Sequence, residues 1–172
     1  MRKLFFPMAL VASLILGACG SDGSYTSGIT CEQARELDQE LIDNIAFAQG
    51  RAEFELGEPI EVTLSVTNCS DARATIRYRD AQRYDFTVSP VGAQGREVWR
   101  WSQGKTSAQV LGEETFEPGE TKTYTEVWDQ MSNLGEQVSP GRYVLSAGDL
   151  RCEFEAPPSC ASGISVVIGI MR

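Results

Sequence analysis

The stretch Ile60-Glu61-Val62-Thr63-Leu64-Ser65-Val66-Thr67 decides the fold, because apolar and polar residues alternate along it at every position. Strand side chains point alternately to the two faces of a sheet, so this pattern predicts a strand with one buried face. The same period of two recurs over residues 74–79, 84–89, 143–147 and 164–170, Trp99 and Trp101 share a face, and residues 121–128 are rich in the Thr, Tyr, Val and Trp that suit a strand. We therefore expect at least seven short strands.

Turn residues separate these segments, among them Pro118-Gly119 and Pro140-Gly141. A lone sheet would leave its apolar face in water, so two sheets must pack together. The prediction is an all-β, immunoglobulin-like antiparallel β-sandwich. Pro140-Gly141-Arg142-Tyr143 supports it, since this string resembles the turn and tyrosine that open a late strand in immunoglobulin-like domains.

A different period precedes the strands. Thr30 and Gln33 match a capping box, and four apolar residues then recur at spacings of three and four: Ala34, Leu37, Leu41 and Ile45. This predicts a short N-terminal helix over residues 31–44. The pattern does not fix where this helix ends, because Ile45-Ala46-Phe47 could already be extended.

The N-terminus has the pattern of an export signal. Met1-Arg2-Lys3 is basic, and the apolar run over residues 4–16 is shorter than the roughly twenty residues that span a bilayer. Leu16-Gly17-Ala18-Cys19 resembles the lipobox of bacterial lipoproteins. The resemblance implies cleavage before Cys19 and lipid on its thiol; the alternative is an ordinary signal peptide with a chance cysteine.

The chain then divides into four expected parts. Residues 1–18 are the lipoprotein signal peptide, and residues 19–30, rich in Gly and Ser, form a flexible tether. Residues 31–48 are a helical extension, and residues 49–172 are the β-sandwich domain. The expected location is the cell envelope, with the lipid in a membrane. Gly20, in place of Asp, favours the outer membrane facing the periplasm if the host has two membranes.

Four cysteines are left when Cys19 carries lipid, and an even number in an exported chain favours disulfides over reduced thiols. Three pairings are possible. Cys152 and Cys160 flank a short loop with a Pro-Pro turn, so we expect them to form a local bridge. Cys31 and Cys69 would then form the second bridge.

Composition excludes several functions. The formal net charge is −9, and loss of Arg2 and Lys3 on cleavage would make it −11, which argues against nucleic acid as a partner. The sequence contains no histidine, which excludes Ser-His-Asp and Cys-His catalysis. Glu113 and Glu114 could act as an acid–base pair, but a hydrophilic loop is the favoured interpretation. We expect no enzyme activity, no metal and no cofactor.

Several motifs together resemble one known family. They are Tyr84-Asp85-Phe86, Glu97-Val98-Trp99-Arg100-Trp101-Ser102, Pro118-Gly119-Glu120, Trp128-Asp129 and Pro140-Gly141-Arg142-Tyr143. Their order and spacing over about residues 52–150 are similar to the BsuPI domain, the intracellular proteinase inhibitor family. The resemblance implies an immunoglobulin-like sandwich and inhibition of serine proteases.

Two kinds of contact surface follow as hypotheses. For a protease partner, the loops over residues 103–109 and 152–160 are the candidates. Aromatic residues could instead line a groove for peptide or sugar, although core packing is favoured for them: Trp99, Trp101, Trp128 and Tyr124. Asp85 and Asp129 are expected to bond backbone amides. The alternative function is a non-enzymatic immunoglobulin-like binding or assembly module of the envelope.

Overall fold

The computed structural model describes residues 25–93, 96–153, 159–160 and 163–172, and gives only the backbone of residues 153, 159 and 160. Its elements in chain order are β1 (Tyr25–Ser27), α1 (Cys31–Glu36), β2 (Leu41–Phe47), β3 (Glu53–Glu55), β4 (Ile60–Asn68), β5 (Ala74–Tyr78), β6 (Tyr84–Pro90), β7 (Trp99–Arg100), β8 (Gly112–Phe116), β9 (Thr121–Trp128), β10 (Gly141–Asp149), β11 (Cys152–Glu153), β12 (Ser159–Cys160) and β13 (Ile164–Met171). The expected signal peptide and Cys19 lie outside the described residues.

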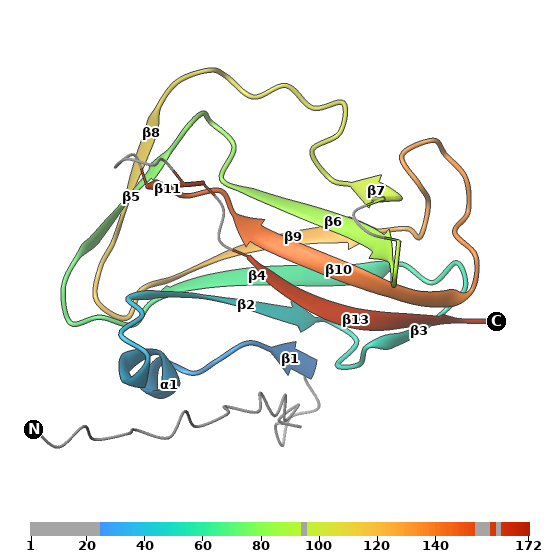
Figure 1. Ribbon diagram of the computed structural model, residues 1–172, viewed down its shortest axis with the longest axis horizontal. Coiled ribbons are helices and arrows are strands. Elements are labelled where there is room, and N and C mark those ends of the chain that lie inside the picture. Colours follow the sequence, from blue (N-terminus) through green and yellow to red (C-terminus); the bar gives the residue numbers. More distant parts are fainter. Residues whose placement is uncertain (1–24, 94–95, 154–158, 161–162) are drawn as a thin grey trace, which may run out of the picture.

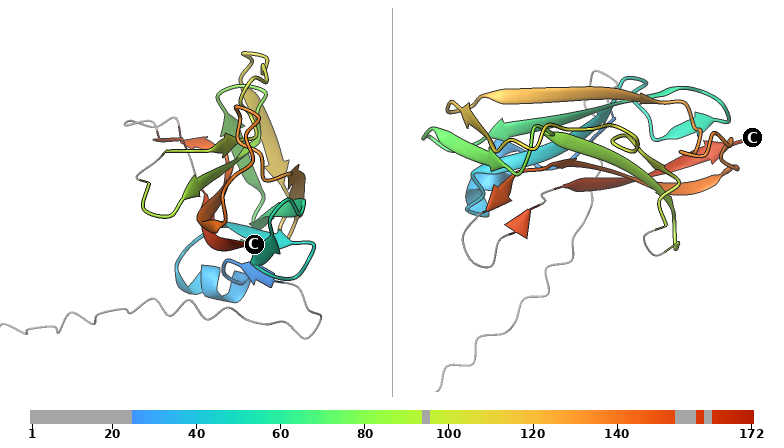
Figure 2. Two further views of the ribbon diagram at one scale, coloured as in Figure 1. Left: turned by 90° about the vertical axis from the view of Figure 1, so that its right-hand side faces the viewer. Right: turned by 90° about the horizontal axis from the view of Figure 1, so that it is seen from above.

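Two sheets pack face to face, as Figures 1 and 2 show. One has the strand order β1-β2-β4-β9 and the other the order β3-β13-β10-β6-β7. Their strands pair antiparallel except for β3, which pairs parallel with β13. The predicted all-β sandwich is therefore confirmed.

The core lies between the two sheets. All four apolar residues of the opening alternation are fully buried: Ile60, Val62, Leu64 and Val66. Trp128, also fully buried, packs against Trp99 and edge-on against Tyr143, with ring centroids 6.1 and 6.2 Å apart. The Tyr143 hydroxyl donates to the Ser139 carbonyl at 2.7 Å, which is the hydrogen bond of a tyrosine corner.

A bent ribbon closes one end of the sandwich. The β4–β9 pair ends at Thr67 and Thr121, and the pairing resumes beyond a corner as β5 with β8. Asn68 holds this corner: its buried amide donates to the carbonyls of Ala72 and Phe116 at 2.8 and 3.1 Å. The ribbon thus turns β5 and β8 across the end, at the left of Figure 1.

The predicted helix begins correctly but is wrong in its length. Thr30 and Gln33 form the expected reciprocal capping box. The helix ends at Glu36, however, because Asp38 has a left-handed φ of 56°. Residues expected to continue it form β2, which pairs with β1 and β4. A spacing of four, as between Leu41 and Ile45, also suits a strand, whose inward positions recur every two residues.

Two further expectations are corrected. The last part of the expected tether is not free, because β1 pairs with β2 and Tyr25 packs near Phe47 with ring centroids 5.9 Å apart. Glu113 and Glu114, expected in a loop, lie in β8. Among the described residues, no helix is long and apolar enough to cross a bilayer.

The Cys31–Cys69 disulfide is confirmed, with the two Cα atoms 5.0 Å apart. It fixes α1 to the end of β4. Cys152 and Cys160 are direct partners in the antiparallel β11–β12 pair. The side chain of Cys160 lies outside the described part, so a bridge between these two stays a prediction.

Candidate functional site

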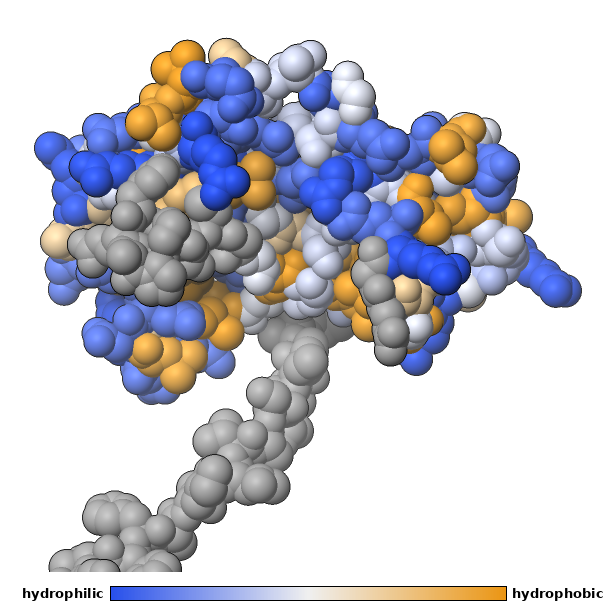
Figure 3. Space-filling view, turned by 45° about the horizontal axis from the view of Figure 1, so that its top comes forward, coloured by the Kyte–Doolittle hydropathy of each residue, from blue (hydrophilic) through white to orange (hydrophobic). Residues whose placement is uncertain are grey.

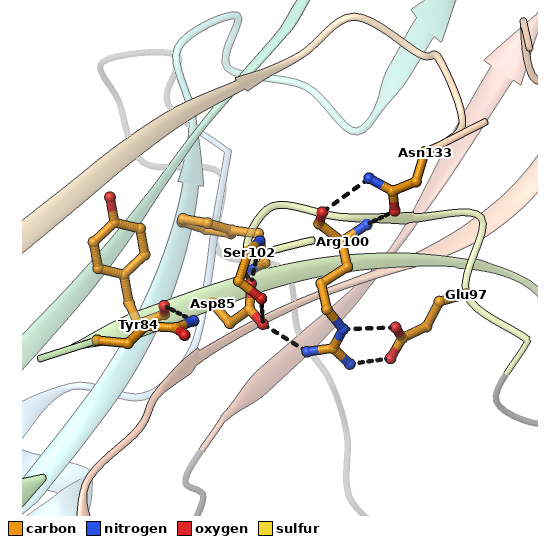
Figure 4. A network of polar contacts seen from close by, with 8 residues as sticks. Tyr84, Asp85, Glu97, Arg100, Ser102 and Asn133 are labelled. Carbon is orange, nitrogen blue, oxygen red and sulfur yellow. Dashed lines mark hydrogen bonds and ion pairs between the residues drawn. The ribbon is translucent and has the colours of Figure 1, made fainter. Parts of the chain in front are cut away.

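A buried carboxylate organises the chain around β7. Asp85, on β6, is 7% exposed, and its Oδ2 accepts from Arg100 Nη1 at 2.6 Å and from the Ser102 hydroxyl at 2.7 Å (Figure 4). Its Oδ1 accepts from the backbone N–H groups of Phe86 and Ser102. The expectation that Asp85 bonds backbone amides is confirmed, and Asp129 likewise accepts from the Met131 N–H at 3.1 Å.

Arg100 connects this carboxylate to two other segments. Its guanidinium donates twice to Glu97, and this contact, with a smaller contribution from Asp85, raises the pKa of Arg100. The Arg100 backbone is also paired with Asn133: the Arg100 N–H donates to Asn133 Oδ1 at 2.6 Å, and Asn133 Nδ2 donates to the Arg100 carbonyl at 3.0 Å. We call these five residues, Asp85, Glu97, Arg100, Ser102 and Asn133, the anchor network (Figure 4).

A long loop leaves the anchor network. This β7–β8 loop, residues 101–111, arches above the sandwich in Figure 1. It starts with two turns, in which Gln103 N–H donates to the Arg100 carbonyl at 3.2 Å and Lys105 N–H donates to the Ser102 carbonyl at 3.0 Å. Gly104 takes a φ of 78°, a left-handed conformation that suits glycine. The base of the loop is therefore built directly on the network.

Most of the rest of the loop is exposed, with Ser107 partly buried. Residues 105–111 form neither helix nor strand, and the Ala108 carbonyl accepts from Ala81 N–H at 3.0 Å, which holds the loop at a second point. Val110 and Leu111 are 64% and 72% exposed. Figure 3 shows hydrophobic residues standing out at separate places on a mostly hydrophilic face.

Aromatic rings support the loop from below. Tyr84 stacks on Trp101 and Tyr124, with centroids 4.6 and 4.5 Å apart, and its hydroxyl donates to Glu126 at 2.6 Å. Burial raises the pKa of Tyr84 and raises that of Tyr124 to about 12, so both stay neutral at physiological pH. The ammonium of Lys105 lies 3.3 Å from the centre of the Trp101 ring.

The groove that the sequence suggested for four aromatic residues does not form as a unit. Trp128 is fully buried, and Trp99, Trp101 and Tyr124 pack as partly buried residues against the same core. The favoured core interpretation therefore holds for Trp128, and the other three cover the edge of the core.

A buried ionic cluster at the ribbon end was not foreseen. Arg151 donates to both oxygens of Asp43 at 3.1 and 3.2 Å and lies 3.5 Å from Asp149, which also accepts from the Tyr78 hydroxyl at 3.5 Å. Asp149 is fully buried, and this burial raises its pKa to about 6 despite the opposing effect of Arg151. No sequence motif joins Asp43 to Asp149, so only the fold reveals the cluster.

The two glutamates of β8 pair with cations rather than with each other. Glu113 contacts Arg77 at 2.8 Å, and Glu114 contacts Arg83 at 3.1 Å and Lys122 at 3.3 Å. A cavity of about 260 Å³ lies beside them, lined by Arg77, Tyr78, Leu111, Gly112 and Glu113. Within the described ranges, no three acidic, Cys or His side chains are grouped as metal ligands would be.

The fold and this site define a class of protein: an immunoglobulin-like sandwich with an exposed loop whose base is held by a network of polar contacts. The family model described as BsuPI, intracellular proteinase inhibitor, matches residues 49–149. The chain belongs to this family. The motif residues that suggested it include four of the five members of the anchor network, since only Asn133 lies outside the motifs. No curated protein matches the chain.

Solved structures give weaker similarities. A β-glucosidase from Erythrobacter marinus is 17% identical over 70% of this chain, with a TM-score of 0.39, and one from Listeria innocua with gluconolactone is 15% identical over 87%, with a TM-score of 0.40. This chain covers only 14% and 16% of those enzymes. The C-terminal domain of wzt is 9% identical, with a TM-score of 0.46, over 87% of this chain and 78% of that domain.

Proposed function

We propose that this protein is a non-enzymatic inhibitor of a serine protease, that the β7–β8 loop makes the inhibitory contact, and that lipid on Cys19 holds the domain on a membrane of the cell envelope. Family membership supports the inhibitory role. One observation supports the choice of this loop: its tip is exposed, while its base is bonded to the anchor network. The second candidate loop, residues 152–160, lies largely outside the described residues.

A fixed base favours inhibition over cleavage. A loop that is ordered before binding loses less conformational entropy when it enters a protease cleft. Ser102 is held through both its hydroxyl and its N–H by Asp85, and Lys105 N–H is bonded to the Ser102 carbonyl. The backbone that enters the loop is thus set by a carboxylate that is itself buried.

The expected lipid anchor is compatible with a protein partner. With the signal peptide removed, the chain would carry a formal net charge of −11. Such a domain is repelled by anionic headgroups, so the lipid would tether it while its loops stay in solution. The same acidity argues against nucleic acid as a partner.

The test incubates the purified chain with a panel of serine proteases and with a detergent extract of the envelope. Slow-turnover inhibition through a 1:1 complex is expected, and it should be lost when residues 103–109 are replaced by Gly and Ser at equal length. Thr123→Ala, on an exposed position of β9, is the matched control. If every protease keeps full activity while a defined envelope protein is captured, the chain is a binding or assembly module instead.

A further inference from the structure

The β7–β8 loop carries no acidic residue. The chain carries 24 acidic residues, yet none occurs between Glu97 and Glu113. Within that stretch the charged residues are Arg100, at the base, and Lys105, in the loop. No carboxylate of the loop itself therefore opposes the approach of a negatively charged group.

Lys105 is the cation of the β7–β8 loop, and it is exposed. Arg100 is neutralised by Glu97 and Asp85, and Lys122 contacts Glu114. No carboxylate in the described part of the chain pairs with Lys105, whose ammonium contacts the face of Trp101 instead. That contact is weak at an exposed site, so an ionised hydrogen-bond acceptor on a partner would replace it.

The backbone presents this side chain at a defined place. Lys105 follows Gly104, closes the second turn with its N–H, and begins the exposed run to Leu111. Since Ser102 ties this turn to Asp85, the position of Lys105 depends on the anchor network rather than on the loop itself. The alternative contacts, Val110 and Leu111, lie beyond the second fixed point at Ala108 and lead into β8.

We infer that Lys105 is the residue that enters the primary specificity pocket of the target, and that the target is a protease whose pocket carries a carboxylate and recognises lysine. The inference rests on the proposed function. Trp101 then has two roles: it holds the lysine ammonium before binding, and it offers an apolar face to the protease once the ammonium has left.

The experiment measures inhibition constants of the full chain against a lysine-directed protease with an acidic pocket and a chymotrypsin-like protease with an apolar pocket. The lysine-directed protease should be inhibited. Lys105→Ala should weaken that inhibition at least 100-fold, and Lys105→Leu should move inhibition toward the chymotrypsin-like protease. Arg142→Ala removes one exposed positive charge from β10 and should change neither constant.

Failure of this inference and failure of the proposed function would give different results. Inhibition of the apolar-pocket protease that survives Lys105→Ala and is lost on Leu111→Ser would overturn this inference and leave the proposed function intact. Inhibition of neither protease, nor of any other in the panel, would overturn the proposed function itself. Unchanged circular dichroism and melting temperature of each variant establish that its effect is not due to unfolding.

Discussion

At the scale of single residues, Trp128 carries the largest packing contribution. It is the largest fully buried side chain, and its indole N–H donates to the Met131 carbonyl at 2.9 Å. The sequence favoured core packing for Trp99 and Trp101 as well, but both are only partly buried against the core. We predict that Trp128→Ala lowers the free energy of unfolding by about 3–5 kcal/mol.

Denaturant titration checks this value against Val127→Ala. Val127 is the preceding residue on β9 and is 53% exposed, so its truncation should cost less than about 0.5 kcal/mol. Equal shifts in the denaturation midpoints of the two variants, relative to the wild type, would contradict the assignment of Trp128 to the core.

We predict that Asp149 gives the stability of the fold a pH dependence. Folding raises its pKa from 3.8 to about 6, so the folded chain binds this proton more tightly than the unfolded chain does. The resulting contribution to stability is fully present below about pH 4 and is lost as the pH rises through 6. At about 1.4 kcal/mol per pKa unit, the loss is on the order of 2–3 kcal/mol.

Asp149→Asn removes this titration while keeping the shape of the side chain. The free energy of unfolding of the wild type, relative to that of the variant, should therefore fall between pH 4 and pH 7. Asp71→Asn provides the control, since the Asp71 side chain is 99% exposed and its variant should run parallel to the wild type. If the free energy of unfolding of the wild type instead rose relative to that of Asp149→Asn over this interval, the attraction of Arg151 would affect the pKa of Asp149 more than burial does.

At the scale of elements, the disulfide holds a helix that is too short to be stable in isolation. The six residues of α1 are fewer than the twelve or more that an isolated helix needs in water. Cys31 and Cys69 are 38 residues apart, and closing a loop of that length stabilises a fold by about 3–4 kcal/mol on chain-entropy grounds. We predict a loss of about this size in the Cys31→Ser, Cys69→Ser double variant, measured by thermal and denaturant unfolding.

The two single variants serve as the comparison for this prediction. Each removes the same bridge, so each should lose nearly as much stability as the double variant. If the double variant were as stable as the wild type, the bridge would contribute no constraint and α1 would be held by packing alone.

The same elements show what a sequence can and cannot predict. Strands with strict alternation were predicted correctly, because an apolar residue occurs at every second position and marks the buried face, as in Ile60 to Val66. β2 was missed because Leu41 and Ile45 fit a helix equally well, and the left-handed Asp38 that ends α1 has no unique local signal. β3 was missed because it has only three residues, and β8 because Gly112-Glu113-Glu114-Thr115-Phe116 does not alternate between apolar and polar residues. The pairing of both is decided by distant strands.

The residues of the candidate site also fall into two groups: those that sequence motifs predicted and those that only the fold reveals. Asp85, Arg100 and Ser102 lie within motifs, so the sequence singled them out before any contact was known. Asn133 contacts Arg100 from 33 residues away, and Arg151 contacts Asp43 from 108 residues away. Such partners are set by topology, and nothing in the spacing of the sequence points to them.

At the scale of the whole molecule, the strand next to the expected tether and the proposed inhibitory loop lie on opposite sides of the sandwich. β1, the described element that follows the expected tether, is at the bottom of Figure 1, whereas the β7–β8 loop arches over the top. A chain anchored through residues before β1 would therefore present its loop away from the membrane. This arrangement supports the proposal that the loop meets a soluble protease.

We predict that a lipid anchor holds the whole chain on a membrane. Leu16-Gly17-Ala18-Cys19 predicts cleavage before Cys19 and acylation of its thiol, and one acyl chain alone anchors only weakly. Radiolabelled palmitate should label the wild type and not Cys19→Ser, which should also leave the membrane fraction. Ser21→Ala, two residues on, should keep both the label and the membrane association. Label retained by Cys19→Ser would disprove the anchor, and a domain released by that variant should still inhibit its protease in solution, because the loop and its anchor network do not depend on the lipid.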